Sequence, residues 1–153
     1  MQYIGSVKEA DEGGCVFCAI VSGEGSGEER ILARSELAFV TLAKYPYNPG
    51  HMLILPVRHV GELEELTAGE NAEIAGLMQR SLRVLREESD PHGFNVGVNL
   101  GRVAGAGIPG HMHWHVVPRW GGDTNFMPVL GETRVLPELL ADTFGRLKRR
   151  FDG

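Results

Sequence analysis

Three histidines alternate with apolar residues in one short segment of the chain. Residues 111–118 read His-Met-His-Trp-His-Val-Val-Pro, so every second position from His111 to His115 carries an imidazole. Successive side chains of a β-strand point to opposite faces, which would place the three rings together on one face. The glycine before the segment and the Val-Val-Pro at its end favour a strand over a helix. We therefore expect a strand whose three imidazoles are exposed to one cleft.

The spacing of the rings bears on what they can bind. Along a strand the outer two Cα atoms would lie roughly 13 Å apart, whereas a zinc ion needs imidazole nitrogens within about 2.1 Å. One flat strand cannot easily bring all three rings to one ion. The row is better suited to the successive oxygens of a polyphosphate, where one ring can attack phosphorus and another can donate a proton to the leaving group. Surface histidines without a role are the weaker alternative.

A glycine-rich loop leads directly into the histidines. Residues 99–110 contain Gly105-x-Gly107-x-x-Gly110, which formally matches a dinucleotide-binding fingerprint. That motif must open a helix, and here it precedes a strand. The backbone amides of such a loop can still point at an anion, with the carboxamide of Asn99 beside them. A merely tight turn remains the alternative.

Apolar patterning along the rest of the chain predicts short strands and helices. Strands are expected at residues 37–42, 52–55 and 94–98, a short helix at 16–21, a long helix that begins at the capping box Thr67-x-x-Glu70 and ends at 90–93, and a C-terminal helix over 140–151. The turn-forming residues between the first two strands favour an antiparallel hairpin. The chain should therefore be an α+β protein.

Length and charge limit the organisation and the partners. The 153 residues suit a single domain, and we expect residues 15–153 to form it behind a flexible N-terminal arm at 1–14. The formal net charge of −5 argues against a nucleic-acid partner, which needs clustered Lys and Arg. No run approaches the roughly 18 apolar residues of a membrane span, and no signal-peptide pattern is present. We expect a cytoplasmic protein without a membrane partner.

The only two cysteines, Cys15 and Cys18, form a Cys-x-x-Cys pair. Their closeness makes a structural disulfide framework implausible. A redox pair, inert core thiols and half of a zinc site are the three interpretations. His59 and His111 could complete a Cys₂His₂ set if the fold brings them together.

Together these motifs resemble the histidine triad (HIT) superfamily of nucleotide hydrolases and transferases. The pattern His-x-His-x-His-x-x with apolar x carries the resemblance at residues 111–117. The other matching segments follow in the family's order over about residues 15–120: Ser-Glu-Leu-Ala-Phe-Val at 35–40, Pro-Gly-His-Met-Leu-Ile-Leu-Pro at 49–56, the long helix, and Asn99-x-Gly101. The chain is most similar to Fhit-like proteins and to bacterial proteins grouped with diadenosine tetraphosphate phosphorylases. This implies a HIT-like fold, with a five-stranded antiparallel sheet, one long helix and a C-terminal helix, usually paired as a homodimer.

The resemblance also implies roles for single residues. His113 looks like the nucleophile that attacks the α-phosphorus and forms a nucleotidyl-histidine, and His115 would contact phosphate or the bridging oxygen. His51, which alone is more typical of a structural histidine, would help to position the imidazoles. The phosphate-binding segment corresponds to Asn99, Gly107 and Ile108. Some members carry structural zinc at the positions of Cys15, Cys18, His59 and His111, which would make His111 an anchor.

The expected function is cleavage of a dinucleoside polyphosphate or a related nucleotide conjugate, with an adenine base and no organic cofactor. Hydrolase and phosphorylase remain open, because they differ only in what attacks the intermediate. A nucleotide-binding regulatory or interaction module without turnover is the alternative. Two departures weaken the transfer of side-chain contacts: Gly107 stands where many members have Gln, and Ala43 stands where Fhit-type hydrolases have a ribose-facing Asn.

Overall fold

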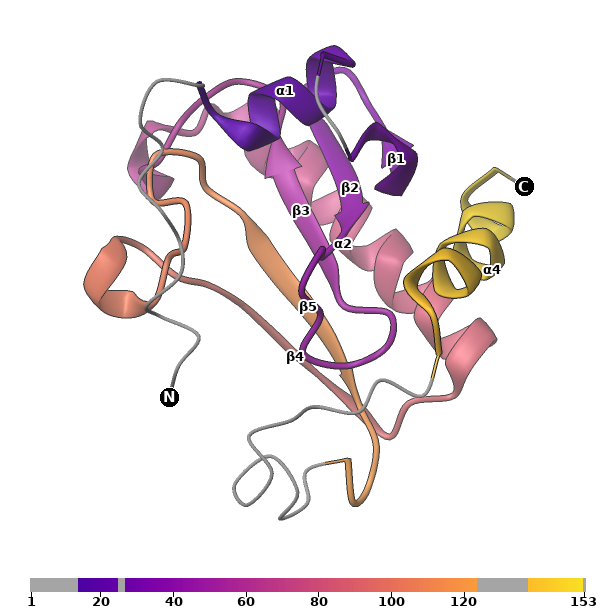
Figure 1. The fold of residues 1–153 in the computed structure, drawn as a ribbon. Coiled ribbons are helices and arrows are strands. Elements are labelled where there is room, and N and C mark those ends of the chain that lie inside the picture. Colours follow the sequence, from indigo (N-terminus) through magenta and orange to yellow (C-terminus); the bar gives the residue numbers. More distant parts are fainter. Residues whose placement is uncertain (1–13, 25–26, 124–137, 153) are drawn as a thin grey trace.

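Five strands form one antiparallel sheet in the order β1-β2-β3-β5-β4 (Figure 1). The computed structural model describes residues 14–24, 27–123 and 138–152. Its strands are β1 (Ile31–Arg34), β2 (Ala38–Leu42), β3 (Met52–Pro56), β4 (Gly93–Val98) and β5 (Trp114–Arg119). The predicted α+β class and five-stranded antiparallel sheet are confirmed. The predicted arm lies, apart from Gly14, outside the described residues.

The long helix α2 (Ala68–Ser89) covers one face of the sheet and begins at the predicted capping box. The Glu70 amide donates to Oγ1 of Thr67 at 3.1 Å, and the Thr67 amide donates to the Glu70 carboxylate at 2.8 Å. The apolar stripe of the helix buries Ile74, Leu77 and Leu85 against the sheet. Each such side chain contributes about 1.5–3 kcal/mol through removal from water.

The C-terminal helix α4 (Leu140–Asp152) packs beside α2 and against β1 (Figure 1). Leu147 and Phe151, one turn apart, are buried in the same core as α2. The helix predicted over 140–151 is confirmed, as is the long helix. Within the described residues, three short 3₁₀ turns connect the elements: η1 (Glu28–Arg30), η2 (Leu63–Glu65) and η3 (Arg102–Ala104). No helix in the described ranges is both long enough and apolar enough to cross a membrane.

The short helix α1 (Val16–Ser22) lies over the opposite face of the sheet (Figure 1). Side chains of β3 alternate: Met52 and Ile54 join the core under α2, whereas Leu53 and Leu55 pack in a second cluster with α1. Leu53 pairs with His115 across the β3–β5 ladder. Partners in register share a face of a sheet, so His115 lies on the α1 side.

Strand β5 begins later than the alternating pattern predicts. The expected strand over residues 111–118 is wrong for its first three positions, because the backbone amides of His111 and Met112 donate to loops and not to a neighbouring strand. The Met112 amide donates to the Val60 carbonyl at 2.7 Å, and the His111 amide donates to the Ile108 carbonyl at 3.4 Å. The alternation of faces persists nevertheless, since Met112 and Val116 are both buried in the core under α2.

Candidate functional site

The three histidines of the alternating segment differ in burial. His111 is 0% exposed and His113 is 7% exposed, while His115 is partly buried. The expectation of three rings exposed to one cleft is therefore wrong, because α1 and the loop after β3 cover the first two. The Phe17 ring of α1 lies 5.6 Å from the His111 ring and 5.2 Å from the His113 ring, measured between centroids.

His51 and His115 form a hydrogen-bonded pair at the start of β3. Nδ1 of His51 accepts the backbone N–H of Tyr47 at 3.1 Å. An amide can only donate, so the proton of neutral His51 resides on Nε2. That nitrogen lies 2.9 Å from Nδ1 of His115 and donates to it. The proton of neutral His115 is therefore on its own Nε2.

The Nε2 atom of His115 is buried and has no hydrogen-bond partner among the described residues. A buried polar group without a partner is costly, by about 1–3 kcal/mol. The cost is removed when a bound group accepts the N–H. The arrangement thus presents a fixed donor suited to an oxygen of a ligand.

The ring of His113 has a defined tautomer as well. Its Nδ1 lies 2.9 Å from the backbone carbonyl of His111, which can only accept. The proton is therefore on Nδ1, and the lone pair is on Nε2. The His113 ring lies 5.1 Å from the His115 ring between centroids. A neutral nitrogen lone pair and a fixed N–H donor are thus held side by side.

Burial keeps these rings neutral. It lowers the pKa of His113, although the hydrogen bond to the His111 carbonyl opposes the shift. Burial, and secondarily the charge that His113 would carry, lower the pKa of His115 to about 4. At neutral pH both rings are therefore uncharged. An uncharged nucleophile can approach a phosphate ester without the repulsion that an anion would meet.

The predicted phosphate-binding segment lies in the loop between β4 and β5. Gly105, with φ of +95°, turns the chain beneath the Asn99 carboxamide. The amides of Gly107 and Ile108 donate to no acceptor among the described residues. The loop is joined to the triad through the hydrogen bond from the His111 amide to the Ile108 carbonyl. Free backbone amides next to the histidines can hold an anion.

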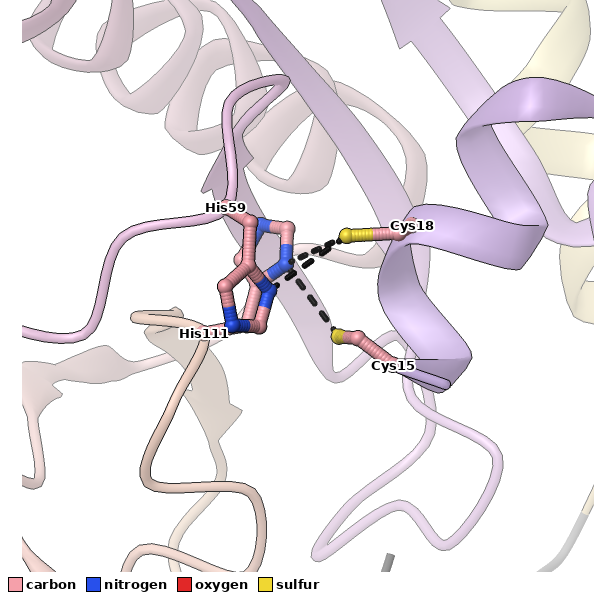
Figure 2. A group of neighbouring side chains, drawn as sticks. All are labelled: Cys15, Cys18, His59 and His111. Carbon is pink, nitrogen blue, oxygen red and sulfur yellow. Dashed lines mark hydrogen bonds between the residues drawn. The ribbon is translucent and has the colours of Figure 1, made fainter. Parts of the chain in front are cut away.

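Four side chains predicted from the sequence as a metal set do come together. The ligand atoms of Cys15, Cys18, His59 and His111 all lie within 4.8 Å of one another (Figure 2). Nδ1 of His111 is 3.4 Å from Sγ of Cys15 and 3.5 Å from Sγ of Cys18. Nδ1 of His59 is 3.4 Å from Sγ of Cys18. Two thiols, one from the residue before α1 and one from α1 itself, thus face two imidazoles from loops distant in the sequence.

The protonation of His111 suits a metal ligand. Its Nε2 donates to the Pro56 carbonyl at 2.9 Å, which leaves the lone pair of Nδ1 facing the two sulfurs. Metal-bound histidines typically donate their other ring N–H to a carbonyl or carboxylate in this way. Two cysteines and two histidines are a closed set for zinc. These four residues could therefore hold a metal ion.

The loop that carries His59 is anchored to α2. Arg58 donates from Nε and Nη2 to the two carboxylate oxygens of Glu70, each at 2.9 Å. Glu70 is the capping-box residue, and its side chain is only 4% exposed. The Arg58 hydrogen bonds, together with those of Thr67, lower the pKa of Glu70 to about 2. A single carboxylate thus fixes both the start of α2 and the loop before His59.

Two aromatic residues of the site escaped sequence reasoning. Phe17 lies between the two cysteines and contacts the rings of His111 and His113. Tyr47 stacks on His51, with centroids 4.9 Å apart and an interplanar angle of 16°. The available signals were their positions, inside the Cys-x-x-Cys pair and in the turn before His51. Neither position indicates by itself which ring the aromatic side chain contacts.

The fold and the paired histidines define a protein of the histidine triad class. The HIT domain family model matches residues 24–122, and the chain belongs to this family. The resemblance found in the motifs is thereby confirmed.

Curated relatives are similar over most of this chain. An AP-4-A phosphorylase of Mycobacterium tuberculosis (strain H37Rv) is 51% identical over 116 residues, which are 76% of this chain and 60% of that protein. The chain thus spans less than two thirds of that relative's length. The adenosine 5'-monophosphoramidase hnt1 of Schizosaccharomyces pombe is 30% identical over 105 residues, 69% of this chain and 74% of that protein.

A solved structure shares the same architecture. The zinc-bound histidine triad family protein from Mycobacterium smegmatis superposes with a TM-score of 0.74 at 29% identity, over 90% of this chain and 93% of that one. That structure holds zinc, which bears on the Cys₂His₂ cluster described above.

Proposed function

We propose that this protein is an enzyme that cleaves dinucleoside polyphosphates, such as diadenosine tetraphosphate, at the α-phosphate through a covalent nucleotidyl-His113. The observation that carries the proposal is the hydrogen bond from Nδ1 of His113 to the His111 carbonyl, which leaves the Nε2 lone pair available. The relative named AP-4-A phosphorylase supports the substrate class.

In the first step, Nε2 of His113 attacks the α-phosphorus. The Nε2–P bond forms, and the bond from phosphorus to the bridging oxygen breaks. The leaving polyphosphate departs with that oxygen and its electron pair. The imidazole keeps its Nδ1 proton, so the intermediate carries a positive ring charge beside the His111 carbonyl.

His115 donates from Nε2 to the bridging oxygen or to a phosphate oxygen and so stabilises the charge that develops there. His51 holds His115 in the required tautomer through the bond between their rings. Asn99 and the amides of Gly107 and Ile108, which donate to no acceptor among the described residues, bind the oxygens of the polyphosphate. Because Gly107 has no side chain, backbone donors carry this contact.

In the second step, inorganic phosphate attacks the α-phosphorus and the Nε2–P bond breaks. The lone pair returns to His113, and the nucleotidyl group leaves as a nucleoside diphosphate. We place phosphate ahead of water as the acceptor because a 51% identical relative is named a phosphorylase. Both half-reactions are complete without an organic cofactor.

We also propose that Cys15, Cys18, His59 and His111 bind structural zinc. The Nδ1 lone pair of His111 faces both sulfurs, and the Cys₂His₂ donor set leaves no open position for a substrate. When bound, the ion would hold α1 against the two loops. The zinc-bound relative from M. smegmatis supports this assignment.

For the organisation of the chain, we propose that residues 15–153 form one HIT domain that pairs as a homodimer in the cytoplasm. The single sheet and the family match at 24–122 support one domain. Analytical ultracentrifugation of the purified chain tests the pairing, and a sedimenting mass of one chain contradicts it.

Product analysis tests the proposed reaction. The enzyme is incubated with diadenosine tetraphosphate with and without inorganic phosphate, and the nucleotides are separated. ADP and ATP formed only with phosphate are expected, whereas AMP and ATP formed without it indicate hydrolysis. The His113→Ala variant should bind nucleotide yet retain less than about a tenth of the activity. If no products form in both conditions, with and without phosphate, the proposed reaction is contradicted and a nucleotide-binding module is favoured.

A further inference from the structure

His51, the residue before β3 that bonds to His115, lies at the end of a tight turn. The His51 amide donates to the Asn48 carbonyl at 3.0 Å, which closes a four-residue turn with Pro49 and Gly50 at its centre. Gly50 has φ of +82°, as a type II turn requires at that position, and proline suits the position before it. A Cβ on Gly50 would lie 2.9 Å from Cδ2 of Leu85. The backbone direction at His51 is therefore imposed locally.

The β3–β5 ladder does not itself extend to His51. Its last pair at this end joins Met52 to Val116, one residue short. The carbonyl of His51 accepts from the Ala43 amide at 3.0 Å, which ties the backbone of His51 to the end of β2. The placement of His51 toward β5 therefore depends on what holds the turn.

The side chain of Asn48 provides that connection. Its Nδ2 donates to the Pro118 carbonyl at 2.9 Å and to the Asp123 carboxylate at 2.8 Å. Pro118 belongs to β5, the strand that carries His115. One carboxamide thus joins the turn that positions His51 to the strand that positions His115.

Asp123 is in turn firmly held. Arg119 donates to it from Nε at 2.6 Å and from Nη2 at 2.8 Å, and the Trp120 amide donates to it at 3.2 Å. The Asp123 side chain is 11% exposed. A carboxylate fixed by a bidentate arginine is a rigid acceptor. The latch formed by Asn48 and Asp123 is therefore preorganised.

We infer that Asn48 and Asp123 are positioning residues that set the hydrogen bond between His51 and His115, and through it the N–H that His115 presents. The kinetic part of its test rests on the proposed function, whereas the part that reads the histidine tautomers does not. Displacement of this turn by a fraction of an ångström would lengthen the bond between His51 and His115, now at 2.9 Å, and would move the adjacent Tyr47 amide that fixes the tautomer of His51. Both rings would then lose their single tautomer. Small misplacements in active sites can reduce rates by about a hundredfold.

The test compares Asn48→Ala with Asn95→Ala. Asn95 accepts from Nη1 of the same Arg119, whereas the Asn48 side chain donates to Pro118 and Asp123, so the Asn95 variant probes the same network without opening the latch. Two readouts are taken: steady-state kinetics with diadenosine tetraphosphate and phosphate, and long-range ¹H–¹⁵N spectra that report the tautomers of His51 and His115.

For Asn48→Ala, kcat should fall about tenfold or more with KM changed less than about threefold, and His51 should lose its single Nε2–H tautomer. Asn95→Ala should change neither readout. An unchanged tautomer in Asn48→Ala, or a kcat loss below about threefold, overturns the inference. If the wild-type protein has no turnover, the proposed function fails and the tautomers alone decide the inference.

A second pair of variants covers the case in which Asn48→Ala does not fold. Asp123→Ala removes the acceptor from the latch, whereas Asp123→Asn keeps an oxygen that can accept from Asn48. The asparagine variant should restore the His51 tautomer and most of the kcat that the alanine variant loses. Equal effects of the two substitutions would show that charge, and not the latch, matters.

Discussion

The backbone carbonyl of His111 accepts the Nδ1–H of His113 at 2.9 Å. The same His111 residue directs its side chain the other way, with Nε2 bonded to the Pro56 carbonyl and Nδ1 facing the sulfurs of Cys15 and Cys18. The proposed metal set and the proposed nucleophile thus meet in one residue. A change in the position of His111 must alter the orientation of His113.

Removal of zinc should therefore affect both stability and turnover. Purified protein should contain about one equivalent of zinc per chain, and chelation should lower the thermal midpoint by about 10 °C and reduce activity. Cys18→Ser should reproduce both effects. Ser22→Ala, on the same helix, serves as the control, because the Ser22 hydroxyl donates to the Ala19 carbonyl one turn earlier and takes no part in the metal set. Less than about 0.2 equivalents in untreated protein would contradict the assignment.

The burial of His115 predicts a pH-dependent stability. Its pKa falls from 6.5 to about 4 on folding, so the unfolded chain binds the proton first. Wild-type protein should lose stability as pH falls from 6.5 to about 4, relative to His115→Gln, and the difference should then level off. We expect a change of about 1–3 kcal/mol in the difference between their free energies of unfolding, measured with urea at each pH. Parallel pH profiles for the two proteins would be inconsistent with a buried, neutral ring.

The Glu70 carboxylate predicts a second effect of pH on stability. Here folding favours the charged form of the group, whereas for His115 it favours the neutral form. Glu70→Ala removes the carboxylate of the capping box and leaves Arg58 without its acidic partner, so it should cost about 2–4 kcal/mol, compared with about 1 kcal/mol for Thr67→Ala. The pKa of Glu70 is lowered from 4.5 to about 2. The advantage of wild type over Glu70→Ala should thus be complete above pH 4.5 and decline toward pH 2. Equal destabilisation by the two variants, measured by urea unfolding, would show that Arg58 adds nothing.

Most of the fold could be predicted from local patterns. The capping box at Thr67 and the apolar stripe of α2 predicted the longest helix because both signals are local. Strand β1 (Ile31–Arg34) was not located by its own sequence, since four residues with one buried side chain show no usable alternation. The late start of β5 depends on a bond between Met112 and Val60, which local patterns do not reveal.

The site was predictable where residue type determines the chemistry. The alternation of residues predicted that His113 and His115 lie on the same face. The four metal-binding candidates could be predicted from their thiol and imidazole side chains and from the zinc positions of the family. The burial of His111 and the bond between His51 and His115 could not be foreseen, because both depend on packing between segments far apart in the sequence. The latch from Asn48 to Asp123 joins residues 75 positions apart for the same reason.

The covalent intermediate on His113 is the central claim, and mass spectrometry tests it directly. The enzyme is mixed with diadenosine tetraphosphate in the absence of phosphate, stopped in alkaline denaturant to preserve the P–N bond, and digested. The account predicts one adenylyl group on the peptide that contains His113, bonded to Nε2, and none in His113→Ala. An adduct on another residue, or turnover without any adduct on His113, would contradict it.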